Sequence, residues 1–315
     1  MPARASDSRS LLLDVAGRLR TATIDALWRQ WSTLGASAAG TVAARAVIDP
    51  EAVVLASLCL VDDEPRLDDV VAQWSLVNGE LLSVQRIKNL SAAYPDVTTR
   101  LAEFARLMSD EGSDARWRSL VRTETPALSY RAGRSRSVRV AFARPPCLLL
   151  RVRVLLGVGV KADAVAFLLS HKRPNGYVDP TDIARIIAYD VASVRRVLSA
   201  LAEAGWLHRV SDPSTGFSTD ESSLGRLLGV AYAEIPEWRY CAGLYAMVVD
   251  LLALTAALPA SATDYALDVV LEEFETKHRL VFVDTGLLQA HRRAPPTDLS
   301  LDLLERAEDF IRNKV

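Results

Sequence analysis

The chain has 315 residues, and its 37 Lys and Arg residues nearly balance its 39 Asp and Glu residues. Half of the residues are hydrophobic, which is an ordinary globular composition for a chain with room for two or three domain cores. Cys59, Cys147 and Cys241 are isolated in apolar surroundings. The sequence therefore offers neither a disulfide framework nor a zinc site, and we expect a reducing, cytoplasmic environment.

Two segments bear on targeting. The opening segment, MPARASDSRS, is not followed by a long apolar core, so we expect no signal peptide. Residues 240–260 are apolar and long enough to span a bilayer, but Asp250 lies at their centre, where a carboxylate costs about 3 kcal/mol on insertion. We therefore expect a buried core helix here and no membrane contact.

The first third of the chain has the pattern of short helices. Apolar residues recur at helical spacing over Ser10–Leu34, and Val97–Met108 predicts a further helix. Between these ranges, residues that start or stop helices flank apolar stretches. The starts are Asp49-Pro50-Glu51, Pro65 and Ser83, and the stop is Asn78-Gly79. We expect residues 1–115 to form a helical domain for packing or dimerisation.

A second interpretation of this region stays open. Residues 83–93 could be the reading helix of a helix-turn-helix, because four of their side chains can hydrogen-bond to DNA. These are Gln85, Arg86, Lys88 and Asn89. Any exposed helix face shows such residues, so we favour the packing domain.

Basic residues are concentrated between residues 116 and 161 of an otherwise acidic chain. This range contains eleven Lys and Arg residues and one acid, Glu124. They are Arg116, Arg118, Arg122, Arg131, Arg134, Arg136, Arg139, Arg144, Arg151, Arg153 and Lys161. Such a run is typical of contact with an anionic partner. We expect residues 116–160 to form a linker or arm.

Within this arm, residues 131–153 are the candidate for gripping phosphates. The candidate contacts are Arg131, Arg134, Arg136 and Arg139, of which Arg134 and Arg136 could also reach a minor groove. The alternative is a basic loop that covers a domain junction. Residues 138–142 alternate as a strand does, and residues 147–160 predict either a strand or a helix.

Residues 161–229 predict, in chain order, a helix, a short second helix, a turn, a third helix and a hairpin. Residues 161–172 have one apolar helical stripe, and Asp179-Pro180-Thr181-Asp182 starts a short helix. Tyr189-Asp190 then makes a turn, with Asp190 as the expected N-cap of the next helix. Gly205 should end that helix in a left-handed conformation, and a two-stranded wing follows it.

The helix over 190–204 would carry the DNA contacts. Its inward stripe is apolar, whereas its outward or flanking residues are Ser193, Arg195, Arg196 and Ser199. An arginine near the start of such a helix can hydrogen-bond guanine or clamp a phosphate. Arg209 at the base of the wing is a further candidate. The wing tip, residues 212–216, contains neither Lys nor Arg.

These residues carry a resemblance to a known module. Ile183-Ala184, Val194-Arg195-Arg196, Leu198, Leu201 and Ala204-Gly205-Trp206-Leu207 resemble the winged helix-turn-helix of MarR-like bacterial transcription regulators. They are also similar to the DNA-binding domains of antitoxins that repress their own operons. The resemblance covers roughly a fifth of the chain and implies a double-stranded DNA partner reached through a major-groove helix.

The last third, residues 230–315, returns to a helical pattern. We expect helices over Trp238–Leu258, Asp264–His278 and Leu299–Val315. The segment LVFVDTGLLQAHRR, which starts at residue 280, predicts a short strand followed by a helical turn. This range would form a helical carboxy-terminal domain.

Catalytic motifs are missing from the sequence. It contains no GxGxxG, GxxxxGK[ST], GxSxG or HExxH. Glu275 and His278 have a spacing that can hold a metal only when a second helix supplies a matching pair. The sequence has no such second pair, so a solvated helix face is the better interpretation. We expect no enzyme, no catalytic residue, no metal and no cofactor.

The sequence thus predicts a mainly α protein with a helical amino-terminal domain, a central winged helix-turn-helix with a small β wing, and a helical carboxy-terminal domain. The expected function is a cytoplasmic, homodimeric transcription regulator that reads the major groove with helix 190–204. The alternative is an antitoxin-like or assembly protein whose winged helix contacts another protein. The acidic terminal thirds and a wing tip without Lys or Arg favour that alternative.

Overall fold

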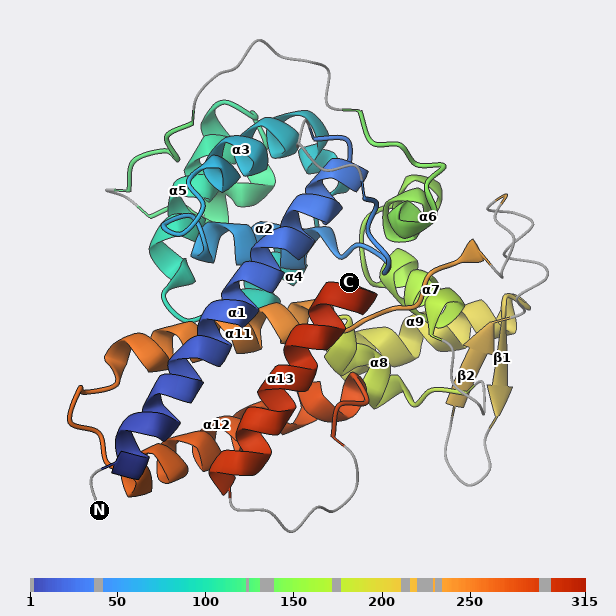
Figure 1. The fold of residues 1–315 in the computed structure, drawn as a ribbon. Helices are drawn as coiled ribbons and strands as arrows, with labels where there is room; N and C mark the ends of the chain where they lie inside the picture. Colours follow the sequence, from blue (N-terminus) through green and yellow to red (C-terminus); the bar gives the residue numbers. More distant parts are fainter. Residues whose placement is uncertain are drawn as a thin grey trace.

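The computed structural model describes residues 3–36, 42–122, 125–130, 139–171, 177–210, 216–219, 229, 234–288 and 296–315, apart from the side chains of 3–7 and 296–299. Over these residues the protein is mainly helical, and its one sheet is a two-stranded antiparallel hairpin. This confirms the predicted mainly α fold with a small β element (Figure 1).

Helices from both ends of the chain form the larger of two hydrophobic cores, which we call the helical body. Its helices are α1 (Ala3–Thr33), α2 (Pro50–Cys59), α3 (Arg66–Asn78), α4 (Val84–Ser91), α5 (Val97–Asp110), α11 (Cys241–Ala257), α12 (Asp264–Asp284) and α13 (Pro296–Lys314), with the 3-10 turns η1 (Gly79–Leu81) and η2 (Ala115–Leu120). α1 lies against α13, α11 and α12 (Figure 1). Residues of the predicted domains 1–115 and 230–315 therefore share one core. Whether either range folds alone stays a prediction.

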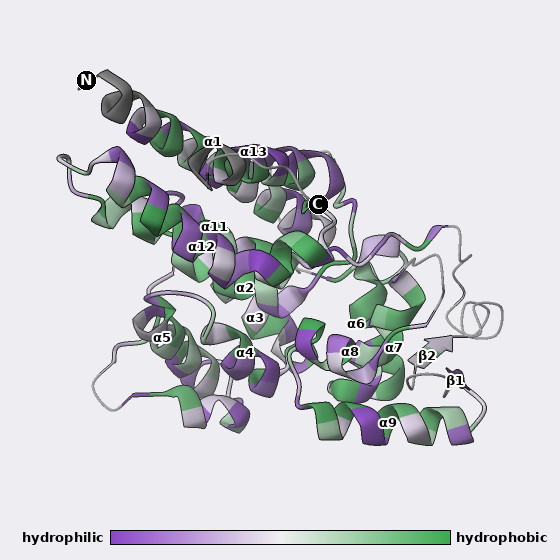
Figure 2. Ribbon diagram, turned by 90° about the horizontal axis from the view of Figure 1, so that it is seen from below, coloured by the Kyte–Doolittle hydropathy of each residue, from purple (hydrophilic) through white to green (hydrophobic). Residues whose placement is uncertain are grey.

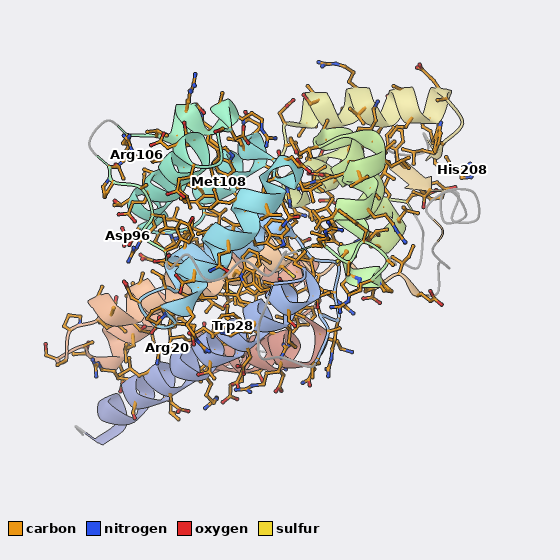
Figure 3. The ribbon with its side chains drawn as sticks, turned by 90° about the horizontal axis from the view of Figure 1, so that it is seen from above. Arg20, Trp28, Asp96, Arg106, Met108 and His208 are labelled. Carbon is orange, nitrogen blue, oxygen red and sulfur yellow. The ribbon has the colours of Figure 1, made fainter. Side chains whose placement is uncertain are left out.

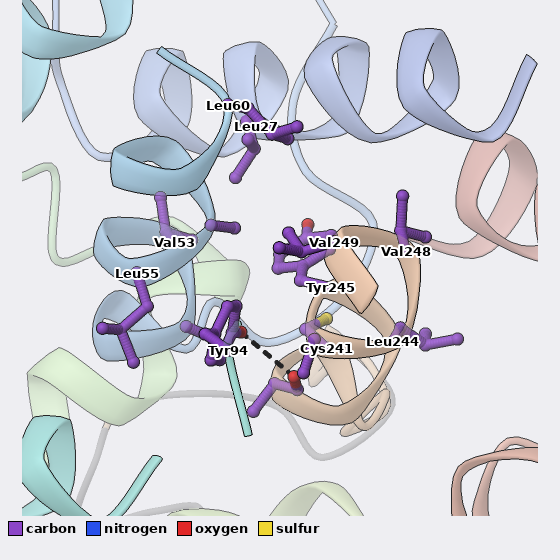
Figure 4. Packing of buried hydrophobic residues seen from close by; sticks show 14 of the residues in the cluster. Leu27, Val53, Leu55, Leu60, Tyr94, Cys241, Leu244, Tyr245, Val248 and Val249 are labelled. Carbon is purple, nitrogen blue, oxygen red and sulfur yellow. Dashed lines mark hydrogen bonds between the residues drawn. The ribbon is translucent and has the colours of Figure 1, made fainter. Parts of the chain in front are cut away.

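The contact between α2 and α11 shows how the two ends of the chain are joined. Leu55 of α2 and Leu244 and Tyr245 of α11 are fully buried in the same core (Figure 4). The Tyr94 hydroxyl donates a hydrogen bond of 3.0 Å to the Ala242 carbonyl, also drawn in Figure 4. A buried tyrosine hydroxyl needs such a partner, because an unpaired polar group is costly in an apolar core.

A second core lies in what we call the central unit, residues 145–219. Its elements are η3 (Pro145–Cys147), α6 (Leu148–Leu156), α7 (Val160–Ser170), α8 (Pro180–Ile186), α9 (Val191–Glu203), β1 (Leu207–Val210) and β2 (Gly216–Thr219). Trp238 packs into this core edge-to-face on Phe167, with ring centroids 5.6 Å apart. The chain that enters the last third therefore helps to hold the central unit against the helical body.

The predicted helix starts are confirmed by their capping bonds. The side chains of Asp49, Ser83 and Asp190 accept hydrogen bonds from backbone N–H groups in the first turns of α2, α4 and α9. Gly205, which follows the C-cap Ala204 of α9, has φ +77°, the left-handed conformation expected of a glycine stop. These short-range signals are reliable here because each depends on a side chain and a backbone group only two or three residues away.

Two local predictions are wrong, and one open alternative is decided. Residues 139–142 are not in a strand, contrary to the prediction for residues 138–142. For residues 147–160, where a strand and a helix were both open, the structure has a helix, α6. The predicted strand after residue 280 is absent, since α12 continues to Asp284. Burial explains that extension: Val281 and Phe282 lie at helical spacing from Phe274 and His278 and pack into the helical body.

The apolar range around Asp250 forms α11, a helix of 17 residues. In the described part of the chain no helix is both long and apolar enough to cross a membrane. Asp250 accepts hydrogen bonds from Lys277 at 2.8 Å and pairs with the His278 ring at 2.7 Å. Burial lowers the pKa of His278 despite this carboxylate. Asp250 thus ties α11 to α12, as expected of a core helix.

Candidate nucleic-acid interface

α9 lies on the outside of the central unit, along the edge opposite α1 (Figures 2 and 3). Its inward side is apolar, because Val194 and Leu198 are fully buried in the second core. Its outward side carries Arg195 and Arg196, which are both exposed. The alternation of hydrophobic and hydrophilic residues along the helix is visible in Figure 2. Both arginines are therefore available to an external partner.

Ser193 differs from the two arginines. It is half-buried, and both its backbone N–H and its hydroxyl bind Asp190, the N-cap of α9. These hydrogen bonds hold the pKa of the Asp190 carboxyl below its usual range, with a smaller contribution from Arg196. The Ser193 hydroxyl is therefore engaged with the N-cap of α9 in this structure. Ser199 is also half-buried and lies nearly two turns further along the helix.

The hairpin places further polar side chains beside α9. β1 and β2 pair antiparallel with Arg209 opposite Phe217 and His208 opposite Ser218. Phe217 is buried, whereas Arg209 and His208 are exposed. A single bridge from Val178 to Phe217 adds a third segment to this ribbon. Of the wing tip, residues 212–216, only Gly216 is among the described residues.

The predicted basic arm is described only in part. Arg131, Arg134 and Arg136 lie outside the described residues, and Arg139 is exposed. The backbone of Arg139 lies against Gly35 at the end of α1, so closely that a side chain at Gly35 would collide with the Arg139 carbonyl. The arm is therefore held against the helical body at Arg139.

Arg153, the last residue of the predicted phosphate-gripping segment, is placed differently from the prediction. It is 1% exposed and belongs to a group of buried charges that we call the ionic cluster. The cluster consists of Asp49, Glu51, Arg86, Arg153 and Asp163. Arg86, a candidate DNA contact in the alternative helix-turn-helix, is buried as well. Neither arginine can reach a phosphate, because both are enclosed by protein on all sides.

The two arginines of the ionic cluster share three carboxylates. Arg153 donates from Nη1 to Glu51 at 2.6 Å and from Nε to Asp163 at 2.8 Å. Arg86 donates to Asp49 at 2.6 Å and to Glu51 at 2.7 Å. A guanidinium suits this position because its planar fork can bind two carboxylates at once.

In the ionic cluster, attraction between opposite charges outweighs the cost of removing Glu51 and Arg153 from water. Burial raises the pKa of the Glu51 carboxyl, but Arg153 and Arg86, together with the N–H of Ser83, bring it below the usual range. Burial lowers the pKa of Arg153, and Asp163 and Glu51 reverse that effect. Glu51 and Arg153 are therefore both charged at neutral pH.

The ionic cluster also holds the turn that precedes α9. Arg86 Nε donates to the Ile187 carbonyl at 2.8 Å, and Asn89 donates to the Ala188 carbonyl at 2.8 Å. The Tyr189 hydroxyl lies 3.1 Å from Asp163 and 3.0 Å from the Ser83 hydroxyl. α4 therefore clamps the α8–α9 turn from the side of the helical body. This clamp fixes which face of α9 points outward.

Sequence reasoning missed this cluster. One signal was available: Asp163 stands in an otherwise apolar helix, where a lone acid needs a buried partner. Glu51 is also buried, but its position directly after Asp49-Pro50 makes it look like an ordinary acid at a helix start. The sequence gives no indication that residues 49, 86 and 163 meet in space.

The described residues contain no candidate metal centre. No group of three His, Cys, Asp or Glu side chains there could hold a metal ion. A shallow pocket of about 370 Å³ lies between the end of α3 and η2. Its one guanidinium, that of Arg116, is neutralised by Asp114 at 2.6 Å and also binds the Gly79 carbonyl at 2.9 Å. His278, which was expected on a solvated helix face, is instead buried and binds Asp250.

The interface can thus be described from its own geometry: an outward helix face with Arg195 and Arg196, an adjoining hairpin with Arg209, and a turn clamped by α4. In comparisons with known proteins, no family model, curated protein or solved structure matches the chain.

Proposed function

We propose that this protein is a cytoplasmic DNA-binding regulator whose α9 enters the major groove as the reading helix of a winged helix-turn-helix. The observation that carries the proposal is the outward position of Arg195 and Arg196 on a helix whose other side is buried. A capped, exposed helix that follows a tight turn is the part that helix-turn-helix proteins place in the groove. Arg209 on β1 would contact the phosphate backbone beside it.

The proposed contacts have separate physical roles. An arginine that binds a guanine through two hydrogen bonds supplies sequence discrimination, whereas an arginine on a phosphate supplies affinity without discrimination. Arg195 and Arg196 are placed for either role, and Arg131, Arg134, Arg136 and Arg139 would add phosphate contacts from the arm. In this proposal two copies of the chain would bind two half-sites on the duplex.

A salt titration tests the proposal. We expect the pure protein to bind a random duplex, measured by fluorescence anisotropy, and to lose affinity steeply as salt rises. Each phosphate contact should contribute a slope of about −0.9 in a plot of log affinity against log salt. A slope of about −3 or steeper would therefore indicate several contacts of this kind. No binding even at the lowest salt would contradict the proposal.

A second candidate function is a protein-protein contact through the same unit, as in an antitoxin-like or assembly protein. Apolar side chains on the central unit favour it. Val154 is 61%, Leu155 49%, Tyr177 43% and Trp206 40% exposed. Exposed apolar side chains in such numbers are common at protein interfaces. A complex that withstands high salt and retains no DNA would support this function over DNA binding.

A further inference from the structure

α12 has an exposed face that carries large apolar side chains. Tyr265 is 78%, Val269 38%, Leu280 54% and Val283 50% exposed. These four residues fall within one narrow stripe when the chain turns by about 100° per residue, as in an α-helix. The opposite face is already used, because Leu267, Leu271, Phe274 and His278 are buried in the helical body.

The stripe has polar residues only at its middle, Glu272 and Thr276. Its two ends are therefore apolar and lie on one side of a helix of 21 residues, which is about 30 Å long. Exposed apolar side chains aligned in this way are unfavourable in water and are typical of a helix that packs against another helix. The spacing alone does not select a partner.

Charge selects the partner and its direction. Beside the stripe, the first half of α12 carries the acid Asp268 and the second half carries the base Arg279. The second half also contains Glu275 and two charges that are already paired within the chain, Lys277 with Asp250 and Asp284 with Arg185. A second copy of α12 running antiparallel would bring Asp268 of one helix beside Arg279 of the other. A parallel copy would place like charges side by side, which is destabilising.

We propose that α12 forms the interface of a homodimer in which two α12 helices pack antiparallel about a two-fold axis near Phe274. This arrangement sets Tyr265 beside Val283 of the second copy and Val269 beside its Leu280. Asp268 then lies beside Arg279 of the second copy. A two-fold interface uses the same patch on both chains, and the sequence of α12 fits itself in this way. The inference needs no DNA and does not rest on the proposed function.

A single helix pair is small compared with the roughly 1,600 Å² of a standard protein interface. We therefore expect a reversible dimer that dissociates on dilution. Sedimentation velocity of the full chain over a range of concentrations should show a monomer–dimer equilibrium. A protein that stays monomeric at every concentration would overturn the proposal.

The double variant Val269→Glu/Leu280→Glu tests the surface. It places carboxylates at both ends of the stripe, so the dimer dissociation constant should rise at least about tenfold. Val77→Glu is the matched control, because Val77 is 52% exposed on α3 and lies outside the stripe. Its dissociation constant should equal that of the wild type. Equal dimerisation of the double variant and the wild type would overturn the proposal.

A charge exchange tests the antiparallel direction. Asp268→Arg alone and Arg279→Asp alone should each weaken the dimer, because each places like charges beside one another across the axis. The combined variant Asp268→Arg/Arg279→Asp should recover most of the wild-type affinity. A combined variant weaker than either single variant would contradict the antiparallel pairing.

Discussion

Replacing Arg153 by Met is expected to lower the free energy of unfolding by about 3–5 kcal/mol, the usual cost of removing one partner from a buried ion pair. The side chain is 1% exposed and binds both Glu51 and Asp163. Without it, the cluster would keep three carboxylates and a single guanidinium, that of Arg86. Urea denaturation at neutral pH, followed by circular dichroism, measures the change.

The matched control is Arg118→Met, because Arg118 is an exposed arginine of η2. This variant should change the free energy of unfolding by less than about 0.5 kcal/mol. Arg153→Lys should recover little of the loss, since an ammonium cannot bind two carboxylates with the geometry of a guanidinium. If Arg153→Met unfolds at the same urea concentration as Arg118→Met, the ionic cluster does not stabilise the fold.

Acid should weaken the same cluster. The pKa of Glu51 is lower in the folded protein than its ordinary value, so this carboxylate stabilises the fold at any pH above its unfolded-state pKa of about 4.3. That contribution is lost as the pH falls from there through the lower folded-state pKa. The Arg153→Met variant lacks one of the two guanidinium groups that lower the pKa of Glu51. Its free energy of unfolding should therefore change less than that of the wild type over this pH range.

The second large effect concerns DNA binding. The double variant Arg195→Ala/Arg196→Ala should weaken binding to duplex DNA at least about 30-fold if each arginine contributes 1 kcal/mol or more. If both bind phosphates instead, the slope of log affinity against log salt should become shallower by about 2. Fluorescence anisotropy across a salt series measures both quantities. Because both side chains are exposed, thermal stability should not change.

The control for this variant removes the same charge from the opposite edge of the molecule. Arg20→Ala/Arg66→Ala deletes two exposed arginines of α1 and α3, and Figure 3 shows Arg20 far from α9. Its DNA affinity should stay within about threefold of the wild type, because charges beyond a Debye length are largely screened. If the two double variants lose equal affinity, α9 is not the reading helix.

Local sequence signals predicted most of the helices and the hairpin. The caps at Asp49, Ser83 and Asp190 and the stop at Gly205 depend on neighbouring residues, so they could be found without knowing the fold. The predictions of secondary structure failed where packing into the core, and not the local sequence, determines the conformation. The helix α12 runs on through Val281 and Phe282 because the helical body covers them, and a propensity for strand does not compete with that packing.

The ionic cluster illustrates what a sequence cannot show. Arg86 stands among polar residues, and Arg153 belongs to the run of basic residues between 116 and 161, so both looked like contacts for an external partner. Their roles depend on Glu51 and Asp163, which come from distant parts of the chain and meet only after folding. For the candidate interface, by contrast, helical periodicity alone indicated that Arg195 and Arg196 point away from Val194 and Leu198.

The most direct test of the account is a photo-crosslink from α9 to DNA. Ala192 is exposed on α9, one turn before Arg195 and Arg196, and an Ala192→Cys variant can be labelled there with a benzophenone maleimide. Burial raises the pKa of Cys147 to about 11 and those of Cys59 and Cys241 to about 12, so the native thiols should stay unlabelled at neutral pH.

Irradiation of the labelled variant with duplex DNA at low salt should give a protein–DNA crosslink. The same label at Val77→Cys, on α3, should give none. A crosslink from Ala192→Cys alone would place α9 on the DNA, as proposed. If the labelled Ala192→Cys protein binds the duplex and yields no crosslink, or if Val77→Cys crosslinks equally well, DNA is bound by another surface and the account is wrong.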